Sequence, residues 1–271
     1  GRITVSNVWK DNMGNEASWQ EATTTGRFAG RTVIVTGAAS GIGQATALRI
    51  AKEGGRVVAA DISKERLDDL VAGNAGVDLV PVAGDISTEE TVAAVVAAAG
   101  GRVDALANVA GIMDNFAPIH EVDDNLWDRV FRISVTALMR LTRAVVQLML
   151  DAGTGSVVNV ASEAGLRGSA AGAAYTASKH AVVGLTKNSA VMYGPKGLRF
   201  NAEAPGPTIT NIVADWGSQL AAERLGPLMQ ATVPTPATAA QLAASITFLL
   251  SDDGTNINGA ILASDDGWSA L

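Results

Sequence analysis

Two side chains that could exchange protons lie four residues apart, Tyr175 and Lys179. The segment Ala173–Ala190 predicts a helix, and this spacing places the phenol and the ammonium on one face of it. A free tyrosine has a pKa of about 10 and exchanges protons poorly at neutral pH. Because a nearby cation favours the phenolate, the pair predicts a tyrosine tuned for acid–base catalysis. An ordinary pair of surface side chains is the alternative.

A glycine-rich turn joins a β-branched run to a helical stretch. Thr32–Thr36 predicts a buried strand, and Gly37, Gly41 and Gly43 follow before a helix that runs to Glu53. This order of strand, turn and helix directs backbone N–H groups and a helix N-terminus toward a pyrophosphate. The turn therefore predicts a dinucleotide site, with an ordinary glycine-rich connection as the alternative.

A carboxylate, Asp61, ends the next predicted strand, Val57–Ala60. Roughly 20 residues beyond the glycines, such a side chain can accept hydrogen bonds from the adenosine ribose hydroxyls. It would also repel a 2′-phosphate, and neither Ser40 nor Ile62 offers a cation to bind one. The sequence therefore favours NAD over NADP. Asp85, after the third predicted strand, could contact adenine or cap the next helix.

Strands and helices alternate from residue 31 to residue 263. This alternation predicts an α/β fold, a single Rossmann-like doubly wound parallel sheet with helices on both faces. One long helix is expected over Leu126–Leu150. We expect an N-terminal extension over residues 1–29, which either wraps around the domain or a neighbouring subunit or forms a floppy tail, and one domain over residues 30–271. Residues 208–236 are expected to be a looser segment that closes the substrate pocket.

The composition excludes several classes of protein. The chain has 271 residues, of which 48 % are hydrophobic, enough for a sizeable core. It has no cysteine and only two histidines, so disulfides, thiolate chemistry and a metal centre are not expected. The net charge of −7 argues against nucleic-acid partners. The apolar runs are shorter than a bilayer span and no signal peptide is visible, so we expect a cytoplasmic protein without a membrane partner.

Taken together, these motifs resemble the short-chain dehydrogenase/reductase family from Thr36 to Gly267. Ser162 precedes Tyr175 by 13 residues, as in that family, and the glycine spacing is that of its ordinary branch rather than its epimerase branch. The matching motifs are Thr36-Gly-Ala-Ala-Ser-Gly-Ile-Gly43, Asp61, Asp85, Asn108-Val-Ala-Gly111, Ser162, Tyr175-x-x-x-Lys179, and Pro205-Gly206 with Thr208 and Thr210.

The resemblance implies an NAD-dependent alcohol dehydrogenase or ketone reductase that forms a homotetramer or homodimer. Tyr175 would be the general acid or base, Ser162 would hold the substrate oxygen, and Lys179 would lower the phenol pKa and bind the nicotinamide ribose. The residues implied in cofactor binding are Gly37, Ser40, Gly41, Ile42, Gly43, Asp61, Ile62, Asp85, Ile86, Asn108, Ala110, Gly111, Tyr175, Lys179, Pro205, Gly206, Thr208 and Thr210.

One position departs from the family pattern. The family carries a catalytic asparagine in the long helix, about 26 residues past the Asn-x-Ala-Gly turn, and this chain has Ser134 there. The asparagine is thought to hold a water that passes protons from the lysine. Serine keeps the backbone carbonyl and adds a hydroxyl, so a weakened relay is expected. Natural divergence, an engineered substitution and a non-catalytic NAD-binding protein are the open interpretations.

The family pattern places the substrate beside the segment that follows Pro205-Gly206. The apolar residues of that segment predict an apolar or cyclic alcohol or ketone, although the fold alone does not set the substrate. Glu203, in an otherwise apolar strand, is either an ordinary residue at the edge of the core or a substrate contact. The candidate pocket residues are Met113, Glu163, Leu166, Ile212 and Trp216.

Overall fold

The computed structural model describes residues 19–209 and 216–271. The predicted positions Thr210 and Ile212, and the first part of the N-terminal extension, lie outside the described residues.

Within these described residues, seven parallel strands form the central sheet, in the order β3-β2-β1-β4-β5-β6-β7. The inner strands are almost fully buried because helices cover both of their faces, and their residues are mainly Val, Ile, Leu and Ala. The predicted doubly wound α/β class is therefore confirmed. The strands are β1 (Thr32–Thr36), β2 (Arg56–Asp61), β3 (Leu79–Ala83), β4 (Ala105–Asn108), β5 (Gly155–Val160), β6 (Leu198–Pro205) and β7 (Ile261–Ser264).

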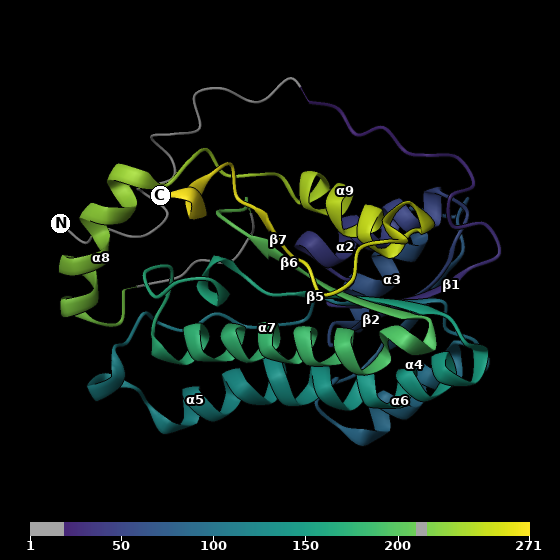
Figure 1. Ribbon diagram of the computed structural model, residues 1–271, viewed down its shortest axis with the longest axis horizontal. Coiled ribbons are helices and arrows are strands. Elements are labelled where there is room, and N and C mark those ends of the chain that lie inside the picture. Colours follow the sequence, from purple (N-terminus) through teal and green to yellow (C-terminus); the bar gives the residue numbers. More distant parts are fainter. Residues whose placement is uncertain (1–18, 210–215) are drawn as a thin grey trace.

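Two layers of helices cover the sheet (Figure 1). On one face lie α2 (Gly41–Lys52), α3 (Lys64–Ala72) and α9 (Ala239–Leu250). On the other face lie α4 (Glu89–Ala98), α6 (Ala137–Ala152) and α7 (Ala173–Tyr193). Each layer contributes fully buried aliphatic side chains, such as Ile50 and Ile246 on the first face and Leu141 on the second.

The long helix predicted over Leu126–Leu150 runs from Asp124 to Ala152 and carries an irregular turn. It consists of α5 (Asp124–Phe131), a π-helical turn (Arg132–Thr136) and α6. π-Helical turns are rare in proteins, and many of those that occur inside α-helices lie at functional sites. By length and apolar composition this helix could cross a membrane. In this structure the α6 part buries one face against the sheet.

The segment expected to be loose contains a helix, α8 (Gln219–Thr232), so that expectation is wrong for these residues. Ser218 caps the helix by accepting a hydrogen bond from the Ala221 N–H. In the sequence, Pro227 argued against a helix here, because proline removes a backbone donor and is rare within helices. Figure 1 shows α8 projecting from the sheet beside the C-terminal end of the chain.

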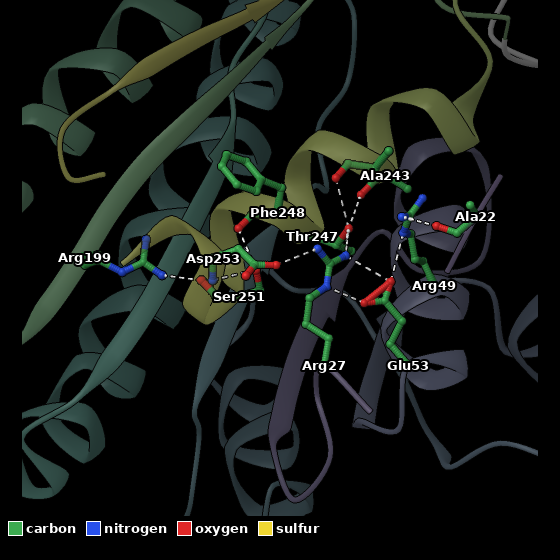
Figure 2. Close-up of polar contacts among 11 residues, drawn as sticks. Ala22, Arg27, Arg49, Glu53, Arg199, Ala243, Thr247, Phe248, Ser251 and Asp253 are labelled. Carbon is green, nitrogen blue, oxygen red and sulfur yellow. Dashed lines mark hydrogen bonds and ion pairs between the residues drawn. The ribbon is translucent and has the colours of Figure 1, made fainter. Parts of the chain in front are cut away.

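The N-terminal extension is anchored to α2 and α9 by an ion cluster around Glu53 (Figure 2). The Glu53 side chain is 0 % exposed, and its carboxylate pairs with Arg27 at 2.5 Å and with Arg49 at 3.1 Å. Arg27 also donates to the hydroxyl of Thr247 on α9. Arg49 donates to the Ala22 carbonyl. Of the two expectations for the extension, wrapping around the domain therefore holds from Ala22 onward.

Candidate active site

The residues that could do chemistry meet at the carboxyl ends of β4 and β5. Ser162 lies two residues past β5, and Tyr175 and Lys179 lie in the first two turns of α7. Ser162 lies close enough to Tyr175 to lower the pKa of its phenol as a hydrogen-bonding neighbour. The Lys179 ammonium lies 5.4 Å from the centre of the Tyr175 ring and donates to the Val160 carbonyl at 3.0 Å. The structure therefore brings the three predicted catalytic side chains together.

The surroundings of Tyr175 oppose the tuning that its spacing from Lys179 predicts. Burial raises the phenol pKa to about 12; the Ser162 hydrogen bond offsets part of this, and the charge of Asp114 adds to it. Burial also lowers the pKa of Lys179 to about 8. The lowered phenol pKa expected from the sequence is therefore not produced by this arrangement of side chains. The expectation counted the charge of Lys179 but not the desolvation of both groups.

Ser134 lies beside Lys179, on the π-helical turn. The two groups flank Gly111, where an added Cβ atom would lie 3.4 Å from Ser134 Oγ and 3.5 Å from Lys179 Nζ. Ser134 is 1 % exposed, and its hydroxyl has no hydrogen-bond partner among the described residues. An unpaired buried hydroxyl costs stability. This hydroxyl is therefore available to a water or a ligand that enters the space around Gly111.

Asp114 fixes the beginning of α7 and was missed by the sequence analysis. Its carboxylate is buried and accepts hydrogen bonds from the backbone N–H groups of Phe116, Gly172 and Tyr175. An acceptor with negative charge at a helix N-terminus stabilises the first turn. Gly172 must be glycine here, because a Cβ atom would lie 2.6 Å from the Asp114 carboxylate. The sequence signal was an acidic residue three positions after Gly111.

The glycine-rich turn has the shape that a pyrophosphate requires. Gly37 has a φ of +63° and packs against the backbone of Ala110. The space beside Gly41 is open, with no atom within 4 Å of an added Cβ. At Gly43 a Cβ would meet the Gly37 carbonyl, so only glycine lets α2 begin this close to the turn. Ser40, the N-cap residue, is exposed, and no side-chain hydrogen bond caps α2. The residues therefore fit a dinucleotide phosphate group.

The predicted ribose and adenine contacts lie next to this turn. The Asp61 carboxylate accepts from the backbone N–H groups of Ala39 and Ser63, which ties the end of β2 to the glycine turn. Ile62 beside it is 75 % exposed and presents an apolar side chain. Asp85 accepts hydrogen bonds from the side chain and backbone of Ser87, and these hold its pKa below the usual range.

Asp85 does not provide the cap of α4. That cap is Thr88, whose hydroxyl accepts from the Thr91 N–H. Ile86, which follows Asp85 in the chain, is half-buried. Asp85 is therefore free of the capping role that was one of its two predicted functions.

Asn108 is turned into the core rather than toward the glycine turn. Its amide donates to Thr142 Oγ1 and to Asn159 Oδ1, both at 2.9 Å. Asn159 continues the chain of contacts by donating to Thr186 on α7. The side chain predicted to bind cofactor thus joins β4, β5, α6 and α7, which keeps the helix bearing Tyr175 in place.

The remaining predicted cofactor residues lie around the ends of β1, β4 and β6. The Thr36 hydroxyl accepts from the backbone N–H groups of Val109 and Ala110. Gly206 packs against Asp265, where an added Cβ would lie 2.7 Å from the Asp265 Cβ. Thr208 is buried, and its hydroxyl donates to the Gly206 carbonyl. Pro205 ends β6. Ile42 is half-buried in the first turn of α2.

An apolar cluster forms the candidate substrate wall. Phe116 and Trp216 lie with ring centres 4.5 Å apart, and Met113 and Trp268 pack into the same cluster. Leu166 is 38 % exposed and could extend it. Glu163, predicted as a further wall residue, is 1 % exposed and faces other charged side chains. Of the predicted wall residues, Met113 and Trp216 therefore lie in the cluster, whereas Glu163 is held inside the protein.

Glu203 is an internal residue with hydroxyl partners rather than a cation. Ser245 Oγ donates to its carboxylate at 2.6 Å. Burial raises the Glu203 pKa to about 7, against the hydrogen bonds from Ser245 and Ser264. Its place in the buried strand β6 favours the structural interpretation over substrate contact. No group of three or more His, Asp or Glu side chains that could hold a metal ion occurs in the described part of the chain.

Comparison with known proteins decides the family. The model of the short chain dehydrogenase family matches residues 31–221. The chain belongs to this family. It is 40 % identical over 255 residues to 3beta-hydroxysteroid dehydrogenase 2 of Eggerthella lenta, covering 90 % of this chain and 96 % of that protein. The family binds nicotinamide cofactors, so this chain is an oxidoreductase of the short-chain type.

Two solved structures share its fold over most of their length. The crystal structure of levodione reductase has a TM-score of 0.80 and 34 % identity, and the match covers 90 % of this chain and 99 % of that one. A candidate NAD(P)-dependent gluconate 5-dehydrogenase from Beutenbergia cavernae has a TM-score of 0.78 and 36 % identity, covering 91 % and 100 %. The latter structure holds NADP at low occupancy. The short-chain dehydrogenases similar to this chain therefore include one that accepts the phosphorylated cofactor.

Proposed function

We propose that this protein is an NAD-dependent oxidoreductase that interconverts a secondary alcohol and a ketone, with Tyr175 as the acid or base. One observation carries the proposal, the convergence of three side chains: Ser162 lies beside the Tyr175 phenol, and Lys179 lies one turn further along α7 with its ammonium 5.4 Å from the Tyr175 ring. Two neighbouring hydroxyls can both hydrogen-bond a carbonyl or alcohol oxygen placed between them. Proton transfer by a positioned side chain of this kind contributes typically 10²–10⁴-fold to the rate.

Each side chain then has a separate task. Tyr175 gives its proton to the substrate oxygen in ketone reduction and takes it back in alcohol oxidation. Ser162 holds that oxygen next to the phenol. The Lys179 cation stabilises the phenolate that reduction leaves on Tyr175. The nicotinamide cofactor, when bound, supplies the hydride chemistry. The Ser134 hydroxyl and Lys179 border the same space at Gly111, so a water bound there would contact both groups and could relay a proton from Lys179.

Asp61 supports NAD as the preferred cofactor. Two backbone N–H groups already point at its carboxylate, so the charge is fixed at the end of β2. A carboxylate accepts hydrogen bonds from ribose hydroxyls and repels a phosphate in their place. Ser40 and Ile62, the flanking positions, carry no charge. The NADP found in one similar structure makes the NADP control essential.

The substrate is an apolar, cyclic secondary alcohol or the matching ketone. The wall formed by Met113, Phe116 and Trp216 is apolar and aromatic. Such a wall suits a flat ring system, because aromatic side chains stack on it over a large area. The names of the similar proteins, a hydroxysteroid dehydrogenase and levodione reductase, agree with this class.

We also propose that the active protein is a homo-oligomer, a tetramer or a dimer. Trp127 and Phe131 stack on α5, and Trp127 is partly exposed. Val191 and Met192 near the end of α7 are exposed as well. A second copy of the chain would remove these side chains from water. Light scattering during gel filtration gives the mass directly, and a monomer at micromolar concentration would rule the oligomer out.

The decisive experiment follows NADH formation with a panel of cyclic secondary alcohols at alkaline pH. The variant Tyr175→Phe removes the phenol oxygen, and Tyr193→Phe is its matched control, because the only other tyrosine packs its ring on Phe200 away from the site. We expect turnover with NAD, a loss of at least about 10²-fold in kcat for Tyr175→Phe, and no change for Tyr193→Phe.

The alternative is a non-catalytic NAD-binding protein, which Ser134 in place of asparagine favours. NADH fluorescence titration separates the two hypotheses. Tight NADH binding without turnover of any alcohol or ketone, and equal behaviour of the two tyrosine variants, would support the alternative.

A further inference from the structure

Glu163 is a buried carboxyl group directly after Ser162. It begins a short 3-10 turn, Glu163–Gly165, and is 1 % exposed. Arg167 Nε lies 2.7 Å from Glu163 Oε1 as an ion pair. Neither carboxyl oxygen receives an aligned hydrogen bond from an N–H or hydroxyl donor of the described residues. The group therefore needs another partner.

That partner is a second carboxyl group, Asp265, which follows β7. The Asp265 carboxyl group lies close enough to Glu163 to shift its pKa, both as a hydrogen-bonding neighbour and as a charge. Asp265 is buried, and its two oxygens also accept from the backbone N–H groups of Gly267 and Ser269. A hydrogen bond between two carboxyl groups needs a proton on one of them. Because backbone donors already serve Asp265 as an anion, Glu163 is the group that carries the proton.

The titration of the two groups agrees with this assignment. Burial, and next the contact with Asp265, raises the pKa of Glu163 to about 8, although Arg167 acts in the opposite direction. Burial alone would raise the pKa of Asp265, but the hydrogen bonds from Glu163, Ser269 and Gly267 outweigh it and lower that pKa. Two carboxyl groups in contact titrate as a unit, the first proton leaving early and the second late.

The pair joins three parts of the candidate site. Glu163 follows Ser162, whose own hydroxyl accepts from the Ala164 N–H in the same turn. Asp265 packs against Gly206 of the predicted cofactor turn. The guanidinium of Arg167 lies 4.2 Å over the ring of Trp268. The Trp268 indole N–H donates to Thr232 at the end of α8.

We propose that Glu163 and Asp265 share one proton, and that this carboxyl pair ties the Ser162 turn to the C-terminal turn that supports α8. Glu163 is thus a positioning residue for Ser162. A second ionisation places two anions in contact inside the protein with one cation, Arg167, beside them. The repulsion separates the two turns and moves Ser162 away from Tyr175.

The other ionisable groups near this turn are engaged elsewhere. On α7, Tyr175 lies beside Ser162, and Lys179 donates to the Val160 carbonyl. On β6, Glu203 accepts from Ser245. Among the residues that the structure describes, Arg167 and Asp265 are therefore the charged groups that act on Glu163, and Arg167 alone does not offset two anions.

Two substitutions test the pair without removing its shape. Glu163→Gln keeps a hydrogen-bond donor to Asp265 and cannot ionise. Asp265→Asn gives the Glu163 carboxylate an amide donor, so the shared proton is no longer needed. Glu203→Gln is the comparison variant, because it removes the other carboxyl group whose pKa burial raises, and that group bonds to Ser245 and Ser264 rather than to Asp265.

The first measurement is the melting temperature of the full chain between pH 5 and pH 9, without substrate. A carboxyl group whose pKa is raised in the folded state stabilises the protein fully below its unfolded pKa, and this stabilisation is lost as the pH rises to the folded pKa. From pH 5 to about pH 8 we therefore expect the wild-type protein to lose stability relative to Glu163→Gln. Asp265→Asn should show the same relative gain, and the double variant should add nothing further. Parallel curves for the wild type and Glu163→Gln would overturn the shared proton.

The second measurement is the pH profile of kcat and KM, and this arm alone rests on the proposed function. We expect Glu163→Gln to match the wild type within about twofold at pH 7 and to exceed it increasingly above pH 8. Glu163→Ala should lose about tenfold in kcat with a smaller change in KM for NAD, since a lost buried hydrogen bond costs about 1.4 kcal/mol. Glu203→Gln should leave the ratio to wild type independent of pH. If Glu163→Ala and Glu163→Gln both keep wild-type kcat at every pH, the positioning role is excluded. If the wild type shows no turnover but its melting temperature still falls with pH relative to Glu163→Gln, the proposed function is refuted and the shared proton is still supported.

Discussion

Asp114 Oδ2 lies 2.9 Å from the backbone nitrogen of Tyr175 and accepts its hydrogen bond. The same carboxylate accepts from Gly172, one residue before α7 begins. Asp114 therefore fixes the main chain of the proposed acid–base residue and also places a negative charge near its phenol. The two effects act in opposite directions on catalysis, because the anchor positions Tyr175 while the charge raises its pKa.

Asp114→Asn separates these two effects. The amide keeps one oxygen acceptor for the helix N-terminus and removes the charge. The phenol pKa should fall, so the acid limb of the kcat/KM profile for alcohol oxidation should move to lower pH. The protein should lose about 2 kcal/mol in unfolding free energy, from the lost acceptor and the lost helix-dipole interaction. The checks are a pH profile from 6 to 11 and urea unfolding; an acid limb that stays in place would show that the charge of Asp114 does not reach the phenol.

Ser134→Ala should lower activity without lowering stability. The Ser134 hydroxyl is buried and unpaired among the described residues, so its removal should raise the unfolding free energy by up to about 1 kcal/mol. If the hydroxyl serves the site, kcat should fall about three- to tenfold, the equivalent of one hydrogen bond. Ser134→Asn, which restores the amide common in the family, should raise kcat. Equal kcat for all three proteins would assign Ser134 no part in the reaction.

Asp61→Asn should weaken the preference for NAD. Losing the charge-assisted hydrogen bonds to the ribose costs about 1.5–3 kcal/mol, which is about ten- to a hundredfold in kcat/KM for NAD. The value for NADP should stay the same or improve, because the repulsion of the phosphate is removed. Asp78→Ala, at an exposed carboxylate just before β3, is the control and should change neither value. A wild-type protein that already prefers NADP would contradict the role proposed for Asp61.

Arg27→Ala should destabilise the protein without altering its chemistry. Removing one partner of a buried ion pair costs roughly 3–5 kcal/mol, and Arg49 remains to reduce this to about 2–3 kcal/mol. The matched control is Arg31→Ala, because its ion pair with Asp252 is exposed and should contribute less than about 1 kcal/mol. Urea unfolding measures both, and kcat at 25 °C should be unchanged. Equal losses for the two variants would mean that burial of Glu53 does not matter.

The regular elements were predictable because their signals are local. The β-branched runs, the glycine turn and the Tyr175 helix each have a pattern that a few neighbouring residues decide. Apolar segments alternate with turn residues along the chain, as they do in a doubly wound sheet. The exception, α8, was hidden by Pro227, whose cost the surrounding structure absorbs.

The chemistry around the motifs was less predictable because it depends on distant contacts. Glu163 and Asp265 are far apart in the sequence, and nothing local shows that they meet. The raised pKa of Tyr175 likewise follows from burial, which the spacing of Tyr175 and Lys179 does not encode. Asn108 has the motif of a cofactor contact, but its partners Thr142 and Asn159 turn it inward.

The cluster around Glu53 also bears on how the chain is made. Arg27 and Glu53 emerge early from the ribosome, whereas Thr247 and Asp253, which close the cluster, lie 220 and 226 residues after Arg27. Translation at about 5–20 residues per second separates these events by roughly 10–40 s. During that interval α2 lacks α9, the helix that packs on it, and the apolar side chains of α2 that face α9 stay open to solvent. A nascent chain of this protein is therefore expected to engage a chaperone at α2 until α9 has been synthesised.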